Sequence, residues 1–202
     1  MTETDPGFEH RLLVLEQRLR LLEDHNAIMR LLYSYGPSVD SGLADVVGGL
    51  WTEDGVYDVD TGRMDGRGEI ENMVLTHPHQ GFIQQGCGHI MSPAHITVEG
   101  DTAVAVCHTQ LILQQPDGSG YQVSRVTANR WELARTSDGW RVATRTSRLL
   151  NGHEGSRAIL ASAFDAMGLV DGVASSRRRH PMESEQVRSR VNEGRDQAGN
   201  DR

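Results

Sequence analysis

The sequence predicts an α+β domain in which helices pack on one face of a strongly curved antiparallel sheet. Apolar residues recur at helical spacing through the first third of the 202-residue chain. Strand-like runs separated by hairpin turns dominate from residue 89 onward. A hydrophobic content of 37% in a chain of this length is enough for one hydrophobic core. The concave side of a curved sheet can form a pocket for a small apolar ligand.

The first third of the chain predicts helices. Asp5-Pro6 is typical of a helix start. An apolar seam that needs a partner follows at alternating spacings of three and four: Leu12, Leu15, Leu19 and Leu22. A second stripe continues in a new phase: Ile28, Leu31, Leu32, Tyr35 and Val39. Pro37 lacks an amide donor, so we expect it to bend or break this helix and to leave Asp40 at the helix end.

The remaining pattern predicts short elements and then a meander. Helices are expected over 43–51 and 69–75, with a strand over 56–59. Four strand-like runs follow, at 95–98, 102–113, 121–133 and 140–149. Ser156 to Met167 suits a terminal helix. We therefore expect one domain over 8–170 and a disordered tail over 171–202, where apolar residues are scarce.

Composition argues against several classes of protein. The net charge is −8 and all 20 basic residues are arginines without a basic stripe, so nucleic-acid binding is not expected. The run Arg177 to Arg179 is explained by a solvated tail. No apolar run approaches the roughly 20 residues of a membrane helix, and the acidic start is unlike a signal peptide. We expect a cytoplasmic protein in which Cys87 and Cys107 are reduced.

Four residues from separate predicted elements could form an active site: Asp40, His89, Tyr35 and Arg145. A carboxylate that orients an imidazole, beside a phenol and a guanidinium, can remove a proton and stabilise the resulting negative charge. If the fold brings them together, we expect the Asp40 carboxylate within hydrogen-bonding reach of the His89 ring.

The order of elements and several motifs resemble the SnoaL-like branch of the nuclear-transport-factor-2-like superfamily. The motifs are Trp51-Thr52-Glu53-Asp54-Gly55, Gly88-His89 and Asp138-Gly139-Trp140-Arg141-Val142, and the resemblance covers about residues 15 to 152. It implies a cone-shaped α+β barrel with a cofactor-free pocket and a homo-oligomer, with a trimer favoured and a dimer possible.

The resemblance also implies roles for the four residues. Asp40 and His89 match the Asp–His dyad of the lyases in this branch, while Tyr35 and Arg145 match a catalytic tyrosine and a functional arginine. Two departures stand out. Pro37 interrupts the helix just before Asp40, and Gln110 and Ile112 occupy the neighbourhood where some of these lyases place a further acidic or histidine residue.

Each candidate also has a purely structural interpretation. His89 could be a hydrogen-bonded core histidine, and Asp40 an ordinary turn residue. Tyr35 could only pack in the core, and Arg145 could form surface salt bridges. Strand alternation places Arg145 on the same face as Arg141 and opposite Trp140, without showing which face meets the pocket.

Other polar residues suggest weaker alternatives. A metal site could use histidines, although their spacing is nonspecific and no metal is expected: His77, His79, His95 and His108. Cys87 could be a thiolate nucleophile, but its neighbours Gly86 and Gly88 favour a flexible approach to the pocket.

The sequence thus predicts a cofactor-independent lyase of the dehydratase type, or an isomerase, acting on a small apolar oxygenated ring compound such as a polyketide or steroid-like molecule. His89 would be the base, Asp40 would orient it, and Tyr35 and Arg145 would support the enolate or the leaving hydroxyl. The alternative is a non-catalytic SnoaL-like module that binds a ligand or supports a partner, as the small subunit of ring-hydroxylating dioxygenases does.

Overall fold

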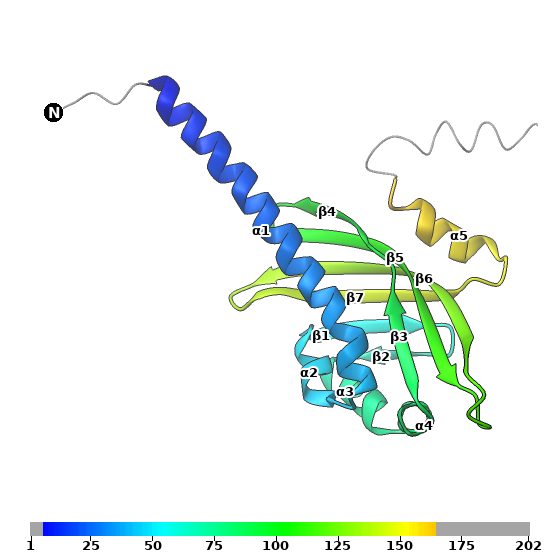
Figure 1. Cartoon of the computed structure of the whole chain (residues 1–202). Helices are drawn as coiled ribbons and strands as arrows, with labels where there is room; N and C mark the ends of the chain where they lie inside the picture. The colour runs from blue at the N-terminus through cyan, green and yellow to red at the C-terminus, as the bar shows by residue number, and fades with distance from the viewer. Residues whose placement is uncertain (1–5, 165–202) are drawn as a thin grey trace, which may run out of the picture. The chain divides into compact units, whose positions relative to one another are not determined.

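The computed structural model describes residues 6–164, which contain five helices and seven strands (Figure 1). The helices are α1 Pro6–Asp40, α2 Ala44–Gly49, α3 Arg67–Leu75, α4 His79–Gln85 and α5 Glu154–Ala161. The strands are β1 Trp51–Val59, β2 Gly62–Asp65, β3 Cys87–Met91, β4 His95–Glu99, β5 Thr102–Gln114, β6 Tyr121–Thr136 and β7 Gly139–Leu149. The α+β fold class is confirmed. The expected tail over 171–202 lies outside the described residues.

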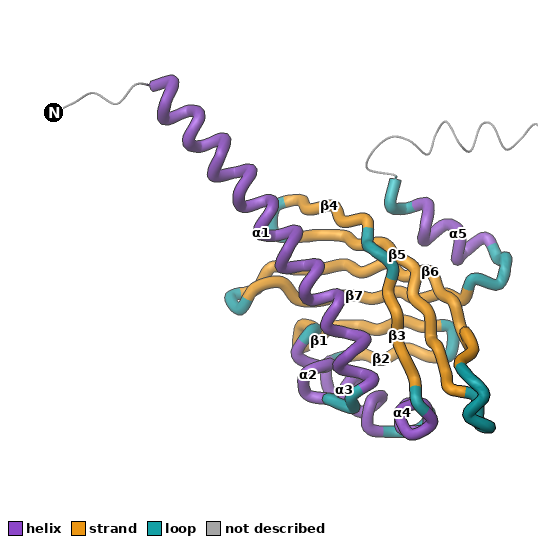
Figure 2. Tube along the Cα trace, viewed as in Figure 1, coloured by secondary structure: helices purple, strands orange, loops and turns teal. Residues whose placement is uncertain are grey.

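The strands form one curved sheet, with helix α1 running across it (Figure 2). The strand order is β2-β1-β7-β6-β5-β3, and β4 also pairs with β5. The prediction of a purely antiparallel sheet was wrong, because β1 pairs with β7 in parallel. These two strands are joined by most of the domain and not by a hairpin, and so long a connection permits a parallel pair. The path ends at β2 and β3, so the sheet does not close into a barrel.

Helix α1 continues through Pro37 and ends at Asp40. The expected break does not occur, and the helix continues for three residues after the proline. The Ser38 hydroxyl donates to the Ser34 carbonyl at 2.7 Å, and the Ser41 amide donates to the Pro37 carbonyl. The predicted position of Asp40 at the helix end is confirmed.

The core lies between the second apolar stripe of α1 and the sheet. Ile28, Leu32 and Val39 are almost completely buried, and two of the largest buried side chains, Trp51 and Trp131, come from the facing strands. The leucine seam nearer the N-terminus is exposed.

None of the helices within residues 6–164 is long and apolar enough to cross a membrane.

A clamp of charged and aromatic groups fixes α1 to the β6–β7 hairpin. Arg135 donates two hydrogen bonds of 2.7 Å to the Asp24 carboxylate, which also accepts one from the Trp140 indole at 3.0 Å. The Arg135 guanidinium lies over the Trp140 ring at 4.4 Å. Hydrogen bonds from Arg135, acting against burial, hold the pKa of Asp24 below its ordinary value.

Helix α1 approaches β3 closely at Gly36. A Cβ atom at this position would lie well within 3.0 Å of the backbone oxygen of His89, which is closer than real Cβ contacts. Only glycine allows the helix to come this near without displacing the strand. The contact sets the end of α1, including Asp40, against the start of β3.

A β-bulge in β7 changes the face on which Arg145 lies. Leu133 pairs with Val142 and Glu132 pairs with Thr144, so Ala143 is an extra residue without a partner of its own. The extra residue shifts the alternation by one. Arg145 therefore shares the buried face with Trp140 and Val142, and the prediction that placed it on the same face as Arg141 was wrong.

Two elements had no counterpart in the sequence analysis. Strand β2 pairs with β1 at the sheet edge, and α4 follows the pair His77-Pro78. The expected helix from Ser156 begins two residues earlier and ends at Ala161.

Candidate active site

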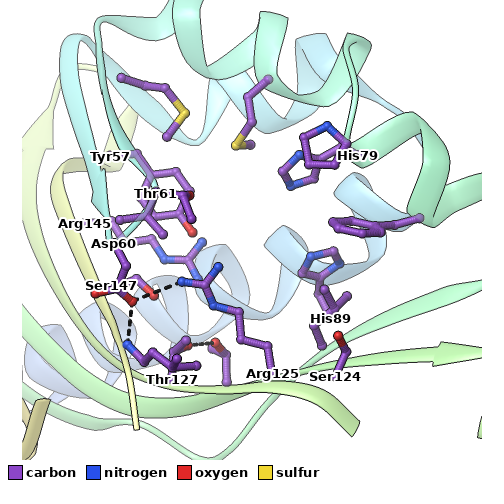
Figure 3. Close-up of a pocket in the computed structure, with 18 of the residues that line it drawn as sticks. Tyr57, Asp60, Thr61, His79, His89, Ser124, Arg125, Thr127, Arg145 and Ser147 are labelled. Atoms are coloured by element: carbon purple, nitrogen blue, oxygen red, sulfur yellow. Dashed lines mark hydrogen bonds and ion pairs between the residues drawn. The ribbon is translucent and has the colours of Figure 1, made fainter. Parts of the chain in front are cut away.

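A pocket of about 680 Å³ opens against the sheet and is lined by residues from α1, α3, α4 and several strands. Apolar side chains form much of the lining, including Val59, Met64, Met73, Phe82 and Leu111. Figure 3 shows the ring of His89 on one wall, near His79, and Arg145 with Tyr57 on the other. Three of the four predicted residues line this pocket: Tyr35, His89 and Arg145.

Asp40 lies behind His89 and holds it at two points. One carboxylate oxygen accepts the His89 backbone N–H at 2.8 Å, and the other contacts ring Nδ1 at 2.5 Å. Both side chains are partly buried. Because α1 ends at Asp40 and β3 begins two residues before His89, the close approach at Gly36 positions this pair.

The Asp40 carboxylate determines the state of the His89 ring. Burial acts to raise the pKa of Asp40, but hydrogen bonds from the ring and backbone of His89 outweigh it, so the pKa lies below its ordinary value. An ionised carboxylate can only accept, so the neutral imidazole carries its proton on Nδ1. The lone pair of Nε2 is then available to the pocket as a base.

Arg145 is a buried cation with an incomplete set of partners. The residue is 3% exposed, and its guanidinium lies 4.1 to 4.5 Å from the ring centroids of Tyr35, Tyr57 and Trp131. Nε and Nη2 donate to the Asn129 amide oxygen at 3.0 and 2.9 Å. Nη1 has no hydrogen-bonding partner among the described residues. Arg145 is also one of the residues that line the pocket.

Asn129 connects Arg145 to a small polar network. Its amide nitrogen donates to the hydroxyls of Thr109 and Thr127, which lie 2.7 Å from each other. These bonds orient the amide so that its oxygen faces the guanidinium. Sequence reasoning missed Asn129, although an asparagine inside a strand-like run is unusual enough to be a signal.

Tyr35 is 3% exposed and lies edge-on to Trp51, Trp131 and His89. Burial raises the pKa of its phenol above the ordinary value. A phenol is protonated at neutral pH even at its ordinary pKa, so Tyr35 can donate a hydrogen bond there.

His79 was considered in the sequence only as a metal ligand, and the structure places it beside the dyad. Its ring is stacked on that of His89, with centroids 6.0 Å apart and planes at 11°. Burial, followed by the nearby His89 and Arg145, lowers the pKa of His79 to about 4. A neutral imidazole at the pocket wall can donate or accept a hydrogen bond.

Cys87 lies next to the dyad as a thiol. Its sulfur donates to Asp40 at 3.2 Å, and burial together with the neighbouring carboxylate raises its pKa to about 12. A thiolate nucleophile is therefore not favoured.

Within residues 6–164, Asp40, Cys87 and His89 are the groups close enough to share a metal ion, but Cys87 and His89 each already hydrogen-bond to Asp40. His77, His79, His95 and His108 are not part of that group.

The family model for the SnoaL-like domain matches residues 20–146, so the chain belongs to the SnoaL-like family. The relationship to nuclear-transport-factor-2-like proteins is also seen in solved structures. An NTF2-like protein with a cystatin-like fold from Novosphingobium aromaticivorans is 42% identical, with a TM-score of 0.70, over 72% of this chain and 94% of that one.

More distant solved structures share the fold alone. A Mycobacterium tuberculosis protein of unknown function is 19% identical, with a TM-score of 0.56, over 76% of this chain and 91% of that one. A Novosphingobium aromaticivorans protein provisionally described as an aromatic ring hydroxylase is 24% identical, with a TM-score of 0.51, over 64% and 90% of the two chains. The comparison with curated proteins returned no significant match.

Proposed function

We propose that this protein is a cofactor-independent lyase of the dehydratase type, or a double-bond isomerase, acting on a small apolar ring compound that carries a carbonyl group. The observation that carries the proposal is the Asp40–His89 pair, whose imidazole lines the same pocket as a buried guanidinium without a carboxylate partner among the described residues. A base and a cation across one apolar pocket suit proton removal next to a carbonyl.

Each residue has a distinct part in this reaction. His89 Nε2 takes the proton from the carbon beside the carbonyl, and Asp40 stabilises the imidazolium that forms. Arg145 stabilises the negative charge that develops on the carbonyl oxygen. Tyr35, a phenol that is protonated at neutral pH, donates to the enolate or to the departing hydroxyl. Loss of hydroxide with the proton gives dehydration, and return of the proton to another carbon gives isomerisation.

The apolar wall supports a ring compound of polyketide or steroid type as the ligand. Met64, Met73, Phe82 and Leu111 offer apolar contact area, and polar side chains such as Gln110, Ser124 and Arg125 also line the pocket. A largely apolar ligand that carries oxygen atoms matches this lining.

The test is proton exchange into a panel of cyclic ketones, followed by NMR in heavy water, with His89→Ala and His89→Gln. Loss of the base should lower the exchange rate by about 10²- to 10⁴-fold while the melting temperature and ligand affinity stay close to those of the wild type. His108→Gln is the matched control, since His108 is exposed on β5 and does not line the pocket.

Two outcomes would contradict the proposal. Exchange at the wild-type rate in folded His89→Ala would show that His89 is not the base. Tight binding of a ring ketone with no exchange in the wild type would favour the ligand-binding module. A structural histidine would instead show itself by a loss of about 1 to 3 kcal/mol in the free energy of unfolding.

A further inference from the structure

The N-terminal part of α1 carries an apolar face that has no partner within the described part of the chain. Its members are between 37% and 67% exposed: Phe8, Leu12, Leu15, Leu19, Leu22 and Met29. We call these residues, with Asn26, the seam. Figure 1 shows this end of α1 extending past the sheet. The match to the family domain begins only at residue 20, so most of the seam precedes the part that the family shares.

The seam follows a heptad repeat without interruption. The spacings from Phe8 to Met29 alternate between four and three residues when Asn26 is included. Leu12, Leu19 and Asn26 then take the first core position of the heptad, called a, and Leu15, Leu22 and Met29 take the second, called d. Three heptads of this kind are typical of a coiled coil.

The seam is free to receive a partner because α1 packs on the sheet through its other side. Ile28 and Leu32 are buried against the sheet, while Met29 and Tyr33, one residue further on, are exposed. At about 100° per residue, Ile28 and the buried Asp24 lie on a different side of the helix from the seam. A helix from another molecule can therefore lie along the seam without meeting the sheet.

The flanking charges select the partner and its direction. Arg11 and Arg18 take the g positions, and Glu16 and Glu23 take the e positions. In a parallel pair of identical helices, each g residue faces the e residue five positions later in the other chain, which pairs Arg11 with Glu16 and Arg18 with Glu23. In an antiparallel pair, arginine would face arginine and glutamate would face glutamate.

Asn26 indicates how the paired helices are aligned and how many of them associate. In a parallel pair it faces Asn26 of the other copy, and a single asparagine at an a position specifies two strands in register at some cost in stability. We propose that residues 8–29 form a parallel two-stranded coiled coil with a second copy of this chain. This differs from the trimer that the family resemblance favours, and it does not depend on the reaction proposed for the pocket.

Cysteine cross-linking of the full chain tests the direction. Leu12→Cys places two a positions side by side in a parallel pair, near one end of the seam, so mild oxidation should give a covalent dimer on a non-reducing gel. In an antiparallel pair the two cysteines would lie at opposite ends. Gln17→Cys, on the f position away from the seam, is the matched control, and the wild type controls for Cys87 and Cys107.

Light scattering on the full chain tests the number of strands. The wild type should have twice the chain mass, and Leu15→Glu with Leu22→Glu should halve it without lowering the melting temperature of the body, since both leucines are exposed. Equal cross-linking of Leu12→Cys and Gln17→Cys, an unchanged mass in the double variant, or a fall from three chains to one would overturn the proposal.

Discussion

Arg145 is the residue whose environment departs most from that of an ordinary core side chain. A buried cation normally has a carboxylate partner, yet within residues 6–164 Arg145 has three aromatic rings and one amide oxygen. Replacing such a cation by an apolar side chain of similar volume is often neutral for stability. The arrangement therefore favours a role toward a ligand.

Arg145→Met should separate that role from packing. We expect the turnover of an active ketone to fall by about 10²- to 10³-fold, as on removal of an oxyanion donor. The free energy of unfolding should change by less than about 2 kcal/mol, because the loss of a donor to Asn129 is offset by removal of a buried charge. Steady-state kinetics and urea unfolding measure both. Unchanged kinetics with a large loss of stability would assign Arg145 to the core.

His79 should make the stability of the domain depend on pH between about 6.5 and 4. Its pKa is lowered to about 4 by burial, so in this range the unfolded chain binds a proton that the folded chain excludes. Stability should therefore fall as the pH is lowered, by at most about 1.4 kcal/mol per pH unit and by less where solvent reaches the ring.

Urea unfolding at a series of pH values measures this effect. His79→Asn should flatten the dependence between pH 6.5 and 4, while the acid loss below pH 4 remains, because Asp24, Asp40 and Asp58 have lowered pKa values. An identical slope in His79→Asn and the wild type would refute the assignment.

At the scale of elements, the crossing of α1 and β3 determines the site. Gly36→Ala places a methyl group against the His89 carbonyl oxygen at less than 3.0 Å, so helix and strand must separate. We expect a loss of about 1 to 3 kcal/mol in the free energy of unfolding. The turnover should also fall, because the displaced residue is the proposed base.

Gly68→Ala is the matched control for that variant. Gly68 lies in α3, and the position that a methyl group would take there has no neighbouring atom within 4 Å, so alanine should be neutral or slightly stabilising. Thermal unfolding and ketone exchange on both variants give the comparison. Full activity in Gly36→Ala would show that the dyad does not need this close approach.

The clamp at Asp24 links α1 to the far end of the sheet. Asp24→Asn removes the charge from a buried carboxylate that Arg135 and Trp140 both contact, and should lower the free energy of unfolding by about 1 to 3 kcal/mol. Asp101→Asn, which affects the same arginine through an exposed carboxylate, should change it by less than about 1 kcal/mol. If urea unfolding gave the same loss of stability for Asp24→Asn and Asp101→Asn, burial of the Asp24 carboxylate would not be the cause of its larger expected effect.

At the scale of the whole molecule, local patterns predicted most of the elements and not their long-range pairing. Pro37 was the signal that placed Asp40 at the end of α1, although the helix continues through it, and turn residues such as Asp138-Gly139 located the hairpin before β7. The parallel pairing of β1 with β7 depends on contacts distant in sequence, which periodicity does not contain.

The residues of the candidate site were likewise predicted only in part. The family resemblance was enough to pair Asp40 with His89, which the structure brings into contact. His79 and Asn129 could not be assigned in advance, because their importance comes from neighbours supplied by other elements. Their roles, like those of the dyad, stay predictions until the variants are measured.

The bulge at Ala143 means that strand length, as well as residue identity, encodes the charge of the pocket. Without the extra residue, Arg145 would turn to the outer face of β7 and the interior would lose its cation, although no functional side chain had been altered. A single-codon insertion or deletion between Trp140 and Arg145 could therefore remove the buried cation from the pocket. Evolution on this scaffold can change ligand chemistry in one such step.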